Sequence, residues 1–209
     1  MILSHRYRFI FFAIPKTGTH AIRFALRPHL GEEDLEQVQL FARKHLPYAD
    51  LARIGHGHLG WRETKAALPA QIWDSYVKFA IVRNPWERFV SYCAFMHRAT
   101  GLFAADPRAA MNRVLDNPEH RMHVVFRPQH EFICAENGRL MIDLVGRHEA
   151  MQSAFDGICE RLGLPTQVLE RVNASAHGPW RDYYDASLRA RVAGVYARDI
   201  EIFSYHFDD

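Results

Sequence analysis

The sequence predicts an α/β protein, a three-layer sandwich with a central parallel sheet flanked by helices. Two apolar runs, residues 9–14 and 79–82, are typical of buried strands, and each is followed by a short polar turn and then by a helical pattern. A third apolar run, 140–145, precedes a helical pattern that ends at Gly163. Strands that alternate with helices imply parallel pairing and right-handed crossovers.

The first half of the chain carries three predicted strands and three helical segments. In order, they are a strand over 8–14, a helix over 19–30 closed by Gly31, an amphipathic helix over 32–46, a short strand over 51–56, a helical stretch over 63–76 interrupted at Pro69, and a strand over 79–82.

The second half begins with the clearest helix start in the chain. Asn84 suits an N-cap, Pro85 suits the first helical position, and Glu87 falls in the first turn. Residues 100–128 predict an irregular, partly helical insertion. The remaining elements are a strand over 140–145, a helix over 149–162 and a last helix over 187–199.

Composition limits the class of protein. The chain has 209 residues, of which 48% are hydrophobic, so it can bury one substantial core, and we expect a single domain over 1–209. A net charge of +2 gives no field that would recruit nucleic acid. No apolar run approaches the roughly 18 residues of a membrane span, and residues 9–14 are too short for a signal peptide. We therefore expect no nucleic-acid partner and no membrane span.

The cysteines do not point to redox or metal chemistry. Cys93, Cys134 and Cys159 are odd in number and lack CxxC spacing. Buried reduced thiols are the expected state, with no catalytic cysteine.

The sequence Pro-Lys-Thr-Gly-Thr joins the first strand to the first helix. Lys16 supplies a full positive charge, Thr17 and Thr19 supply hydroxyls, and the amides of Gly18 to His20 lie at the positive end of the helix dipole. A Walker loop would read GxxxxGK[ST], whereas here the lysine comes first and one glycine follows. The segment predicts a P-loop-like site for a phosphate-like group without ATP hydrolysis; an ordinary strand-to-helix turn is the alternative.

A second segment carries polar groups at the end of the next central strand. Arg83 leaves this strand at its C-terminal end, the edge where open α/β sheets bind ligands. Arg88, Ser91 and Phe95 recur at helical spacing on one face of the following helix. Arg83 and Ser91 could both reach a phosphate near the first loop. The alternatives are a surface ion pair for Arg83 and an exposed hydroxyl for Ser91.

Together these two segments resemble the sulfotransferases that use 3′-phosphoadenosine 5′-phosphosulfate (PAPS). In that family a PK[TS]G[TS] loop holds the 5′-phosphosulfate, and a strand ending in R-[ND]-P-x-x-R-x-x-S-x-Y supplies Arg and Ser to the 3′-phosphate. Both patterns stand here in the expected order, the second from Arg83 to Tyr92. The resemblance implies that Lys16 stabilises the bridging oxygen while Arg83 and Ser91 hold the 3′-phosphate, with adenosine 3′,5′-bisphosphate as the product.

The His-Gly-His sequence of residues 56–58 is similar to an element of carbohydrate sulfotransferases related to the heparan 2-O enzymes. Gln129 and Glu149 also match positions of that branch, as functional or supporting residues. So does the polar C-terminal loop, in which Asn173, Ser175 and Arg181 could close over the adenosine or its 3′-phosphate. His177 departs from the pattern there, because relatives often place Lys or Arg at that position.

His56 and His58 are the candidates for the general base. A neutral imidazole can accept a hydroxyl proton near neutral pH, and residues two apart in an extended segment point the same way. The resemblance implies that one of them is the base, and we favour His58. A metal pair or a polar surface is the alternative, but no HExxH or Cys/His spacing supplies further ligands, so we expect no metal. Trp61 and Arg62 could line an acceptor groove.

The resemblance implies an enzyme of the 2.8.2 type that moves a sulfuryl group from PAPS to a hydroxyl of a small molecule or glycan, with a carbohydrate favoured. Golgi relatives carry an N-terminal anchor that this chain lacks, so a short bacterial-type, cytoplasmic enzyme is expected. A homo-oligomer could complete the acceptor cleft, and the 100–128 insertion would set specificity. The alternatives are a small-molecule or nucleotide kinase with an atypical loop, and a nucleotide-binding module without turnover.

Overall fold

The structure is a computed structural model that describes residues 1–37, 48–170 and 178–209. Its contacts group the chain into two compact units, and we describe each by itself. Unit 1 comprises Met1–Val82 and Glu131–Val172, and unit 2 comprises Arg83–His130 and Asn173–Asp209.

Unit 1 is built on one five-stranded sheet with the strand order β3-β1-β2-β4-β5. The strands are β1 (Ile2–Ser4), β2 (Phe9–Phe12), β3 (Leu35–Glu36), β4 (Val77–Val82) and β5 (Leu144–Arg147). The three strands β2, β4 and β5 pair in parallel, which confirms the predicted parallel centre. The other two strands differ, because β1 pairs antiparallel with both β2 and β3.

The antiparallel edge follows from a short connection that the sequence did not reveal. A turn of four residues, 5–8, joins β1 to β2, and only antiparallel neighbours can be linked so tightly. Ile2 and Leu3 of β1 are fully buried. A strand of three residues is too short to show the hydrophobic pattern by which a strand is predicted. The predicted helix over 32–46 is wrong at its start, where residues 35–36 form β3; residues 38–47 lie outside the described part of the chain.

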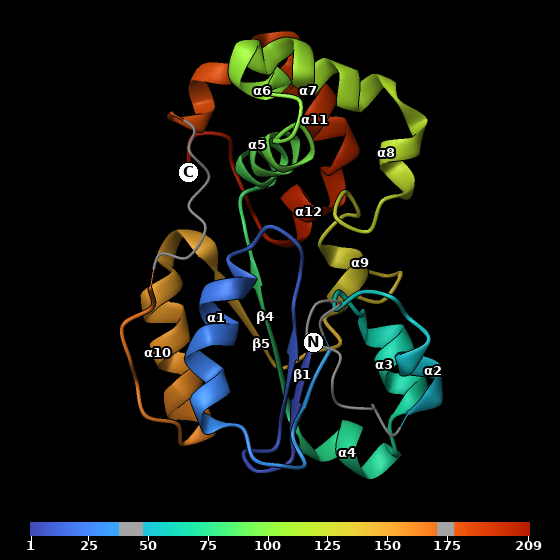
Figure 1. Ribbon diagram of the computed structural model, residues 1–209, viewed down its shortest axis with the longest axis vertical. Coiled ribbons are helices and arrows are strands. Elements are labelled where there is room, and N and C mark those ends of the chain that lie inside the picture. The colour runs from blue at the N-terminus through green and yellow to red at the C-terminus, as the bar shows by residue number, and fades with distance from the viewer. Residues whose placement is uncertain (38–47, 171–177) are drawn as a thin grey trace. The chain divides into compact units, whose positions relative to one another are not determined.

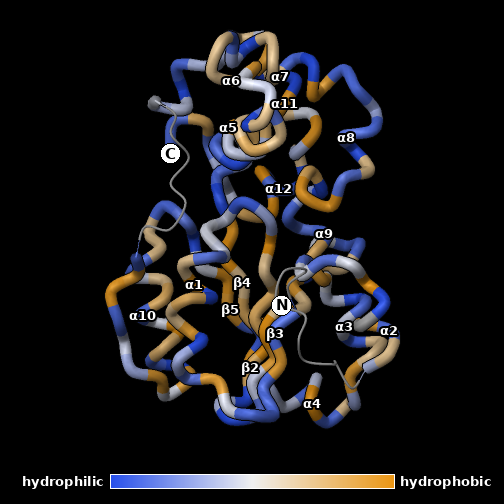
Figure 2. The backbone as a smooth tube through the Cα atoms, viewed as in Figure 1, coloured by the Kyte–Doolittle hydropathy of each residue, from blue (hydrophilic) through white to orange (hydrophobic). Residues whose placement is uncertain are grey.

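Helices cover both faces of this sheet (Figure 1). They are α1 (Thr19–Leu26), α2 (Ala49–Ala52), α3 (Trp61–Ala67), α4 (Ala70–Ser75), α10 (Met151–Leu162) and, from its second residue on, α9 (His130–Ile133), with 3-10 turns η1 (Arg27–His29) and η2 (His148–Ala150). Phe11 and Phe79 pack with the apolar sides of α1 and α10, whereas Phe12 meets Trp73 of α4 on the other face. Figure 2 shows hydrophobic residues along β2 and β4. The three-layer α/β arrangement predicted from the sequence is confirmed in unit 1.

The predicted strand over 51–56 is wrong. Helix α2 ends at Ala52, and residues 54–57 form a bend. The carbonyls of Leu51, Ile54 and His56 accept hydrogen bonds from the side-chain amide of Gln37, at 2.9, 2.8 and 3.3 Å. A side chain thus satisfies the groups that a neighbouring strand would otherwise have bonded.

Unit 2 is helical. Its elements are α5 (Pro85–Met96), α6 (Leu102–Ala105), α7 (Pro107–Asp116), α8 (Pro118–Met122), η3 (Trp180–Tyr183), α11 (Ala186–Val195) and α12 (Ala197–Ile202). Helix α5 begins as predicted, because the Asn84 side chain accepts a hydrogen bond from the Trp86 amide at 3.1 Å. The predicted insertion is largely helical, with Asp106 and Asn117 capping α7 and α8. The single predicted last helix breaks at Tyr196 into α11 and α12.

Other expectations about the chain agree with the structure. Helix α10 ends at Gly163, whose φ of 67° is the left-handed conformation of a C-cap glycine. Cys93, Cys134 and Cys159 all lie in the described residues and are buried thiols, and burial raises the pKa of Cys159 to about 11. Among the described helices, none is both long and apolar enough to cross a membrane.

Candidate functional site

The loop after β2 has an unusual backbone. Lys16 and Gly18 both adopt the left-handed conformation, with φ of 66° and 78°. A Cβ on Gly18 would lie 2.8 Å from the Met151 sulfur and 3.2 Å from the His148 ring, and the left-handed φ also favours glycine. The glycine of Pro-Lys-Thr-Gly-Thr therefore lets the loop pack directly against η2 and the start of α10.

Helix α1 starts at the end of this loop. The amides of Ala21 and Ile22 bond to the Gly18 carbonyl at 3.1 and 3.5 Å, so the N–H groups of Thr19 and His20 precede the first intrahelical bond. Such groups point along the helix axis and bind anions. The Thr17 hydroxyl is buried and donates to the Ile14 carbonyl at 2.9 Å, so it stabilises the turn itself.

Positive charge surrounds the start of α1. Partial burial lowers the pKa of His20, and the cations Arg23, Lys16 and Arg27 lower it further. Arg23 and Arg27 share the carboxylate of Glu36, at 3.3 and 2.8 Å, which leaves an excess of cations over this one anion. A negatively charged group would be stabilised at this helix end.

Residues 56–58 are tied to the strand that leads into the loop. His58 Nδ1 lies 2.7 Å from the Ala13 carbonyl, which can only accept, so Nδ1 carries the proton and Nε2 keeps its lone pair. The His58 amide donates to Nδ1 of His56 at 3.3 Å, so neutral His56 carries its proton on Nε2. The two rings lie 6.3 Å apart. They are thus close as expected, but through a bend and not through an extended segment.

The middle glycine of this turn is required by close packing. A Cβ on Gly57 would lie 2.1 Å from the Gln37 carbonyl oxygen, and the Gly57 carbonyl accepts a hydrogen bond from Arg23 at 3.3 Å. Arg23, which is buried on α1, also bonds the Gln37 carbonyl at 3.3 Å. Helix α1 and the histidine turn are therefore fixed to each other through one guanidinium.

Replacing Gly57 with alanine is expected to destabilise the fold by about 2–3 kcal/mol, because the added carbon overlaps a backbone oxygen that cannot move freely. Gly55 is the matched control in the same turn, since a Cβ there meets nothing within 4 Å. Urea unfolding of Gly57→Ala and Gly55→Ala measures the difference. Equal midpoints for the two variants would contradict the packing argument.

The protonation of His58 links stability to pH. Burial lowers its pKa to about 3, against an ordinary value near 6.5, although the bond to Ala13 opposes the shift. Between pH 6.5 and 3 the unfolded chain binds a proton that the folded chain rejects, so the free energy of unfolding falls as the pH falls. From pH 7.5 to 5.0 we expect wild type to lose up to about 2 kcal/mol more than His58→Asn, measured by urea unfolding. An equal loss in both proteins would show that His58 titrates normally.

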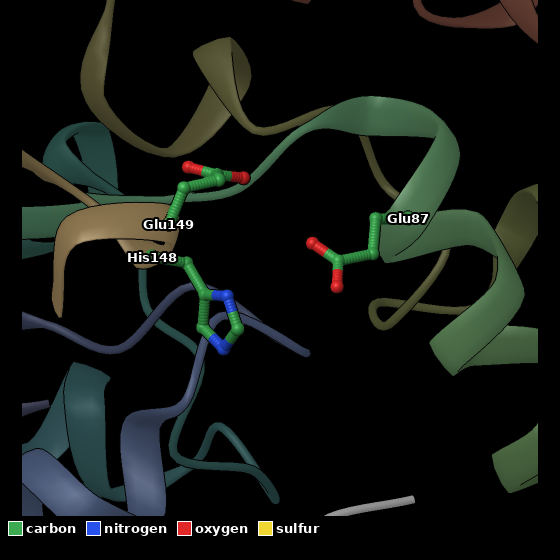
Figure 3. Close-up of side chains that lie close together, drawn as sticks. All are labelled: Glu87, His148 and Glu149. Carbon is green, nitrogen blue, oxygen red and sulfur yellow. The ribbon is translucent and has the colours of Figure 1, made fainter. Parts of the chain in front are cut away.

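Two further residues beside the loop were not singled out as site residues from the sequence. His148 and Met151 come directly after β5 and contact the position of Gly18, and Figure 3 shows His148 and Glu149 on η2. Because β5 is parallel to β4, its C-terminal end reaches the same sheet edge as the loop. The position of His148 directly after a predicted parallel strand was the signal that could have found it.

The ends of β2 and β4 place the starts of the lysine-bearing loop and of the arginine segment. Phe12 of β2 pairs with Ala80 of β4 in parallel register, so both strands end at the same sheet edge. The loop follows β2 there, and Arg83 follows β4 directly. The sequence expectation that the two segments leave one edge of the sheet is confirmed.

Unit 2 shows how Arg83 and its neighbours are held. The Arg83 guanidinium lies 2.9 Å from the Glu87 carboxylate, which Figure 3 draws on the first turn of α5. Ser91 is buried, so the alternative of an exposed hydroxyl is wrong. Arg88 is also buried and donates to the carbonyls of Val125 and Arg127 at 3.1 and 2.8 Å, which makes it a support for that segment.

The remaining candidate residues for donor binding belong to the C-terminal part of the chain. Asn173 and Ser175, with His177, lie outside the described residues. Arg181 is exposed, stacks over Trp180 at 4.3 Å and donates to the Phe207 carbonyl at 3.3 Å. The bond to Phe207 ties it to the C-terminal segment of unit 2.

The groove candidates of unit 1 are engaged by the protein itself. The Trp61 indole donates to the Cys134 carbonyl at 2.8 Å, and the Arg62 guanidinium lies over the Trp61 ring at 4.7 Å. Arg62 also pairs with Glu136 at 3.2 Å. One face of Trp61 is therefore covered by this arginine.

The sheet of unit 1 is parallel at its centre, and its strand β2 leads through a left-handed, lysine-bearing loop to the start of α1, an arrangement typical of sites for phosphate- or sulfate-like groups. The profile of the Sulfotransferase family matches residues 1–206. The match covers nearly the whole chain, and the chain therefore belongs to the sulfotransferase family, whose members carry out sulfuryl transfer. Comparisons with curated proteins and with solved structures gave no match.

Proposed function

We propose that this sulfotransferase uses PAPS as donor and transfers its sulfuryl group to a hydroxyl of a carbohydrate. The donor supplies an activated sulfuryl group with adenosine 3′,5′-bisphosphate as leaving group. The protein has three tasks: to hold the donor's anionic groups, to stabilise charge on the bridging oxygen, and to take the acceptor proton.

The loop and the start of α1 hold the 5′-phosphosulfate. The amides of Gly18, Thr19 and His20 donate to its oxygens, and Lys16 stabilises the charge that develops on the bridging oxygen as the sulfur–oxygen bond breaks. The support for this is the left-handed loop, the helix start and the excess of cations around His20. Thr17 contributes by keeping the turn closed through its bond to Ile14.

Arg83 and Ser91 hold the 3′-phosphate, the first through a charge-assisted pair of hydrogen bonds and the second through its hydroxyl. Asn173, Ser175 and Arg181 close over the nucleotide. Support for Arg83 comes from the parallel register of β2 and β4, which starts both donor-binding segments from one sheet edge.

His58 takes the acceptor proton on Nε2 as the acceptor oxygen bonds to sulfur. The bond from Nδ1 to Ala13 fixes the tautomer that leaves this nitrogen as acceptor, and the ring is anchored to the residue just before the loop. Neutral His56, with its proton on Nε2, acts as a donor that orients the acceptor or the base. No step calls for a metal ion. The carbohydrate acceptor, the cytoplasmic location and a homo-oligomeric state rest on the resemblance and the sequence.

One observation carries the proposal: the lysine-bearing loop and the arginine segment begin from adjacent parallel strands at the same edge. The test is transfer of labelled sulfate from PAPS to a panel of carbohydrate, phenol and alcohol hydroxyls. Titration with adenosine 3′,5′-bisphosphate and with ATP plus magnesium runs beside it. Tight binding of the bisphosphate with transfer to a carbohydrate is expected. Preference for ATP would favour a kinase, and bisphosphate binding without transfer to any acceptor would favour a binding module.

A further inference from the structure

We infer that Gln129 is a positioning residue for Arg83, held in place by the carboxylate of Asp199. The inference rests on the proposed function, because it concerns how this chain sets its arginine for the donor's 3′-phosphate. All the residues that carry it belong to unit 2.

Gln129 pairs with both backbone groups of Arg83. Its side-chain oxygen accepts from the Arg83 amide at 2.8 Å, and its side-chain nitrogen donates to the Arg83 carbonyl at 2.8 Å. Arg83 lies between the end of β4 and the cap of α5. There one amide side chain pairs with both of its backbone groups, as a neighbouring strand can do within a sheet. It fixes the peptide planes on both sides of the Arg83 Cα, and therefore the direction in which the side chain leaves the backbone.

Gln129 is in turn fixed by a carboxylate. The Asp199 oxygens accept from the amides of Gln129 and His130 at 2.7 and 2.8 Å, and from His130 Nδ1 at 2.7 Å. Asp199 and Gln129 have no exposed surface. Three donors on one buried carboxylate give short, charge-assisted bonds that leave the chain little freedom at residues 129–130.

The segment before Gln129 is held from two further elements. Arg88 of α5 donates to the carbonyls of Val125 and Arg127, and the Tyr196 hydroxyl donates to the Phe126 carbonyl at 2.9 Å. Burial lowers the pKa of Arg88, whereas the nearby Tyr196 and Asp199 raise it. The second arginine of the R-N-P-x-x-R sequence therefore supports the backbone that positions the first.

The arrangement differs from ordinary core support in what it fixes. Removing a buried amide that only filled space would lower stability and affect all ligands equally. Removing one that sets the Arg83 direction weakens the group that Arg83 contacts, which in the proposed function is the 3′-phosphate. Two nucleotides that differ in this group alone separate these cases.

The experiment measures the dissociation constants of adenosine 3′,5′-bisphosphate and adenosine 5′-monophosphate for each variant, and takes their ratio as the 3′-phosphate preference. Wild type is expected to prefer the bisphosphate by about 100-fold, since hydrogen bonds to charged groups are strong. Arg83→Met removes most of this preference. Gln129→Met, similar in volume but unable to make either bond, is expected to reduce it at least tenfold while binding of the monophosphate changes less than twofold.

Tyr184→Phe is the matched control, because it removes a hydrogen bond within unit 2, from the Tyr184 hydroxyl to the Trp86 carbonyl at 2.8 Å, without touching Gln129 or the segment before it. It should lower the unfolding midpoint and leave the preference within twofold of wild type. If Gln129→Met does not fold, Gln129→Glu carries the same test, since it keeps the acceptor for the Arg83 amide and loses the donor to the carbonyl.

The outcomes are separable. A wild type without 3′-phosphate preference contradicts the proposed function itself. If wild type and Arg83→Met behave as expected but a folded Gln129 variant keeps the full preference, the positioning role of Gln129 is overturned. The proposed function is then unaffected. A Tyr184→Phe preference that falls as far as that of Gln129→Met also overturns the positioning role, because a general loss of order in unit 2 would then explain both.

Discussion

Lys16→Gly is expected to lower transfer by about 10³-fold while the protein stays as stable as wild type or becomes more stable. The loss follows from removing the ammonium that stabilises the bridging oxygen in the transition state. The stability follows from the backbone, because Lys16 has a φ of 66°, a conformation that costs a non-glycine residue about 1–2 kcal/mol. Single-turnover transfer from PAPS and urea unfolding measure the two effects.

Arg8→Gly is the control for the backbone effect. Arg8 also has a left-handed conformation, with φ of 54°, in the turn between β1 and β2. The Arg8→Gly variant should gain stability as Lys16→Gly does and should keep the full rate of sulfuryl transfer. A second variant, Lys16→Met, keeps the strain and loses the charge, so its transfer should fall as far as that of Lys16→Gly. Transfer within tenfold of wild type in both Lys16 variants would remove this residue from the chemistry.

His58→Ala is expected to lower the rate of transfer by 10²- to 10⁴-fold, the usual contribution of a general base. His58→Asn separates the base from the anchor. The asparagine nitrogen can replace Nδ1 as donor to the Ala13 carbonyl, but nothing replaces Nε2. If His58 is the base, the asparagine variant loses as much transfer as the alanine variant while its affinity for the bisphosphate is unchanged.

His56→Ala completes this set and is expected to lose less than His58→Asn. The acid limb of kcat/KM, which reports the free enzyme, should lie far below pH 6.5 because burial lowers the pKa of His58 to about 3. The bound donor is anionic and should raise that pKa, so the limb in kcat lies at higher pH. A His58→Asn variant that retains transfer, together with a larger loss in His56→Ala, would move the base to His56.

The strained loop and the buried ring of His58 lie at the same end of β2. Lys16 follows that strand, and the His58 ring bonds the carbonyl of Ala13 just after it. Close packing holds them there, since Gly57 admits the Gln37 carbonyl oxygen at a place where any side chain would exclude it. Functional sites commonly store strain in this way.

Much of the fold could be predicted because its signals are local. The run Phe9–Phe12 and the residues of β4 are continuous apolar segments, and Asn84 with Pro85 marks the start of α5 through chemistry that acts within a few residues. The predicted strand over 51–56 failed because a side chain from a distant position, Gln37, satisfies its carbonyls. The hydrophobic pattern of residues 51–56 cannot indicate such a distant partner.

The sequence by itself determined the strand–loop–helix arrangement around Lys16, the alternation of strands and helices, and the start of α5 at Asn84. These features depend on neighbours along the chain. Only the tertiary structure decided that β1 and β3 run antiparallel, that His58 is anchored to Ala13, and that Gln129 and Asp199 hold Arg83. Each of these is a hydrogen bond between groups far apart in sequence, so it exists only once folding has brought the partners together.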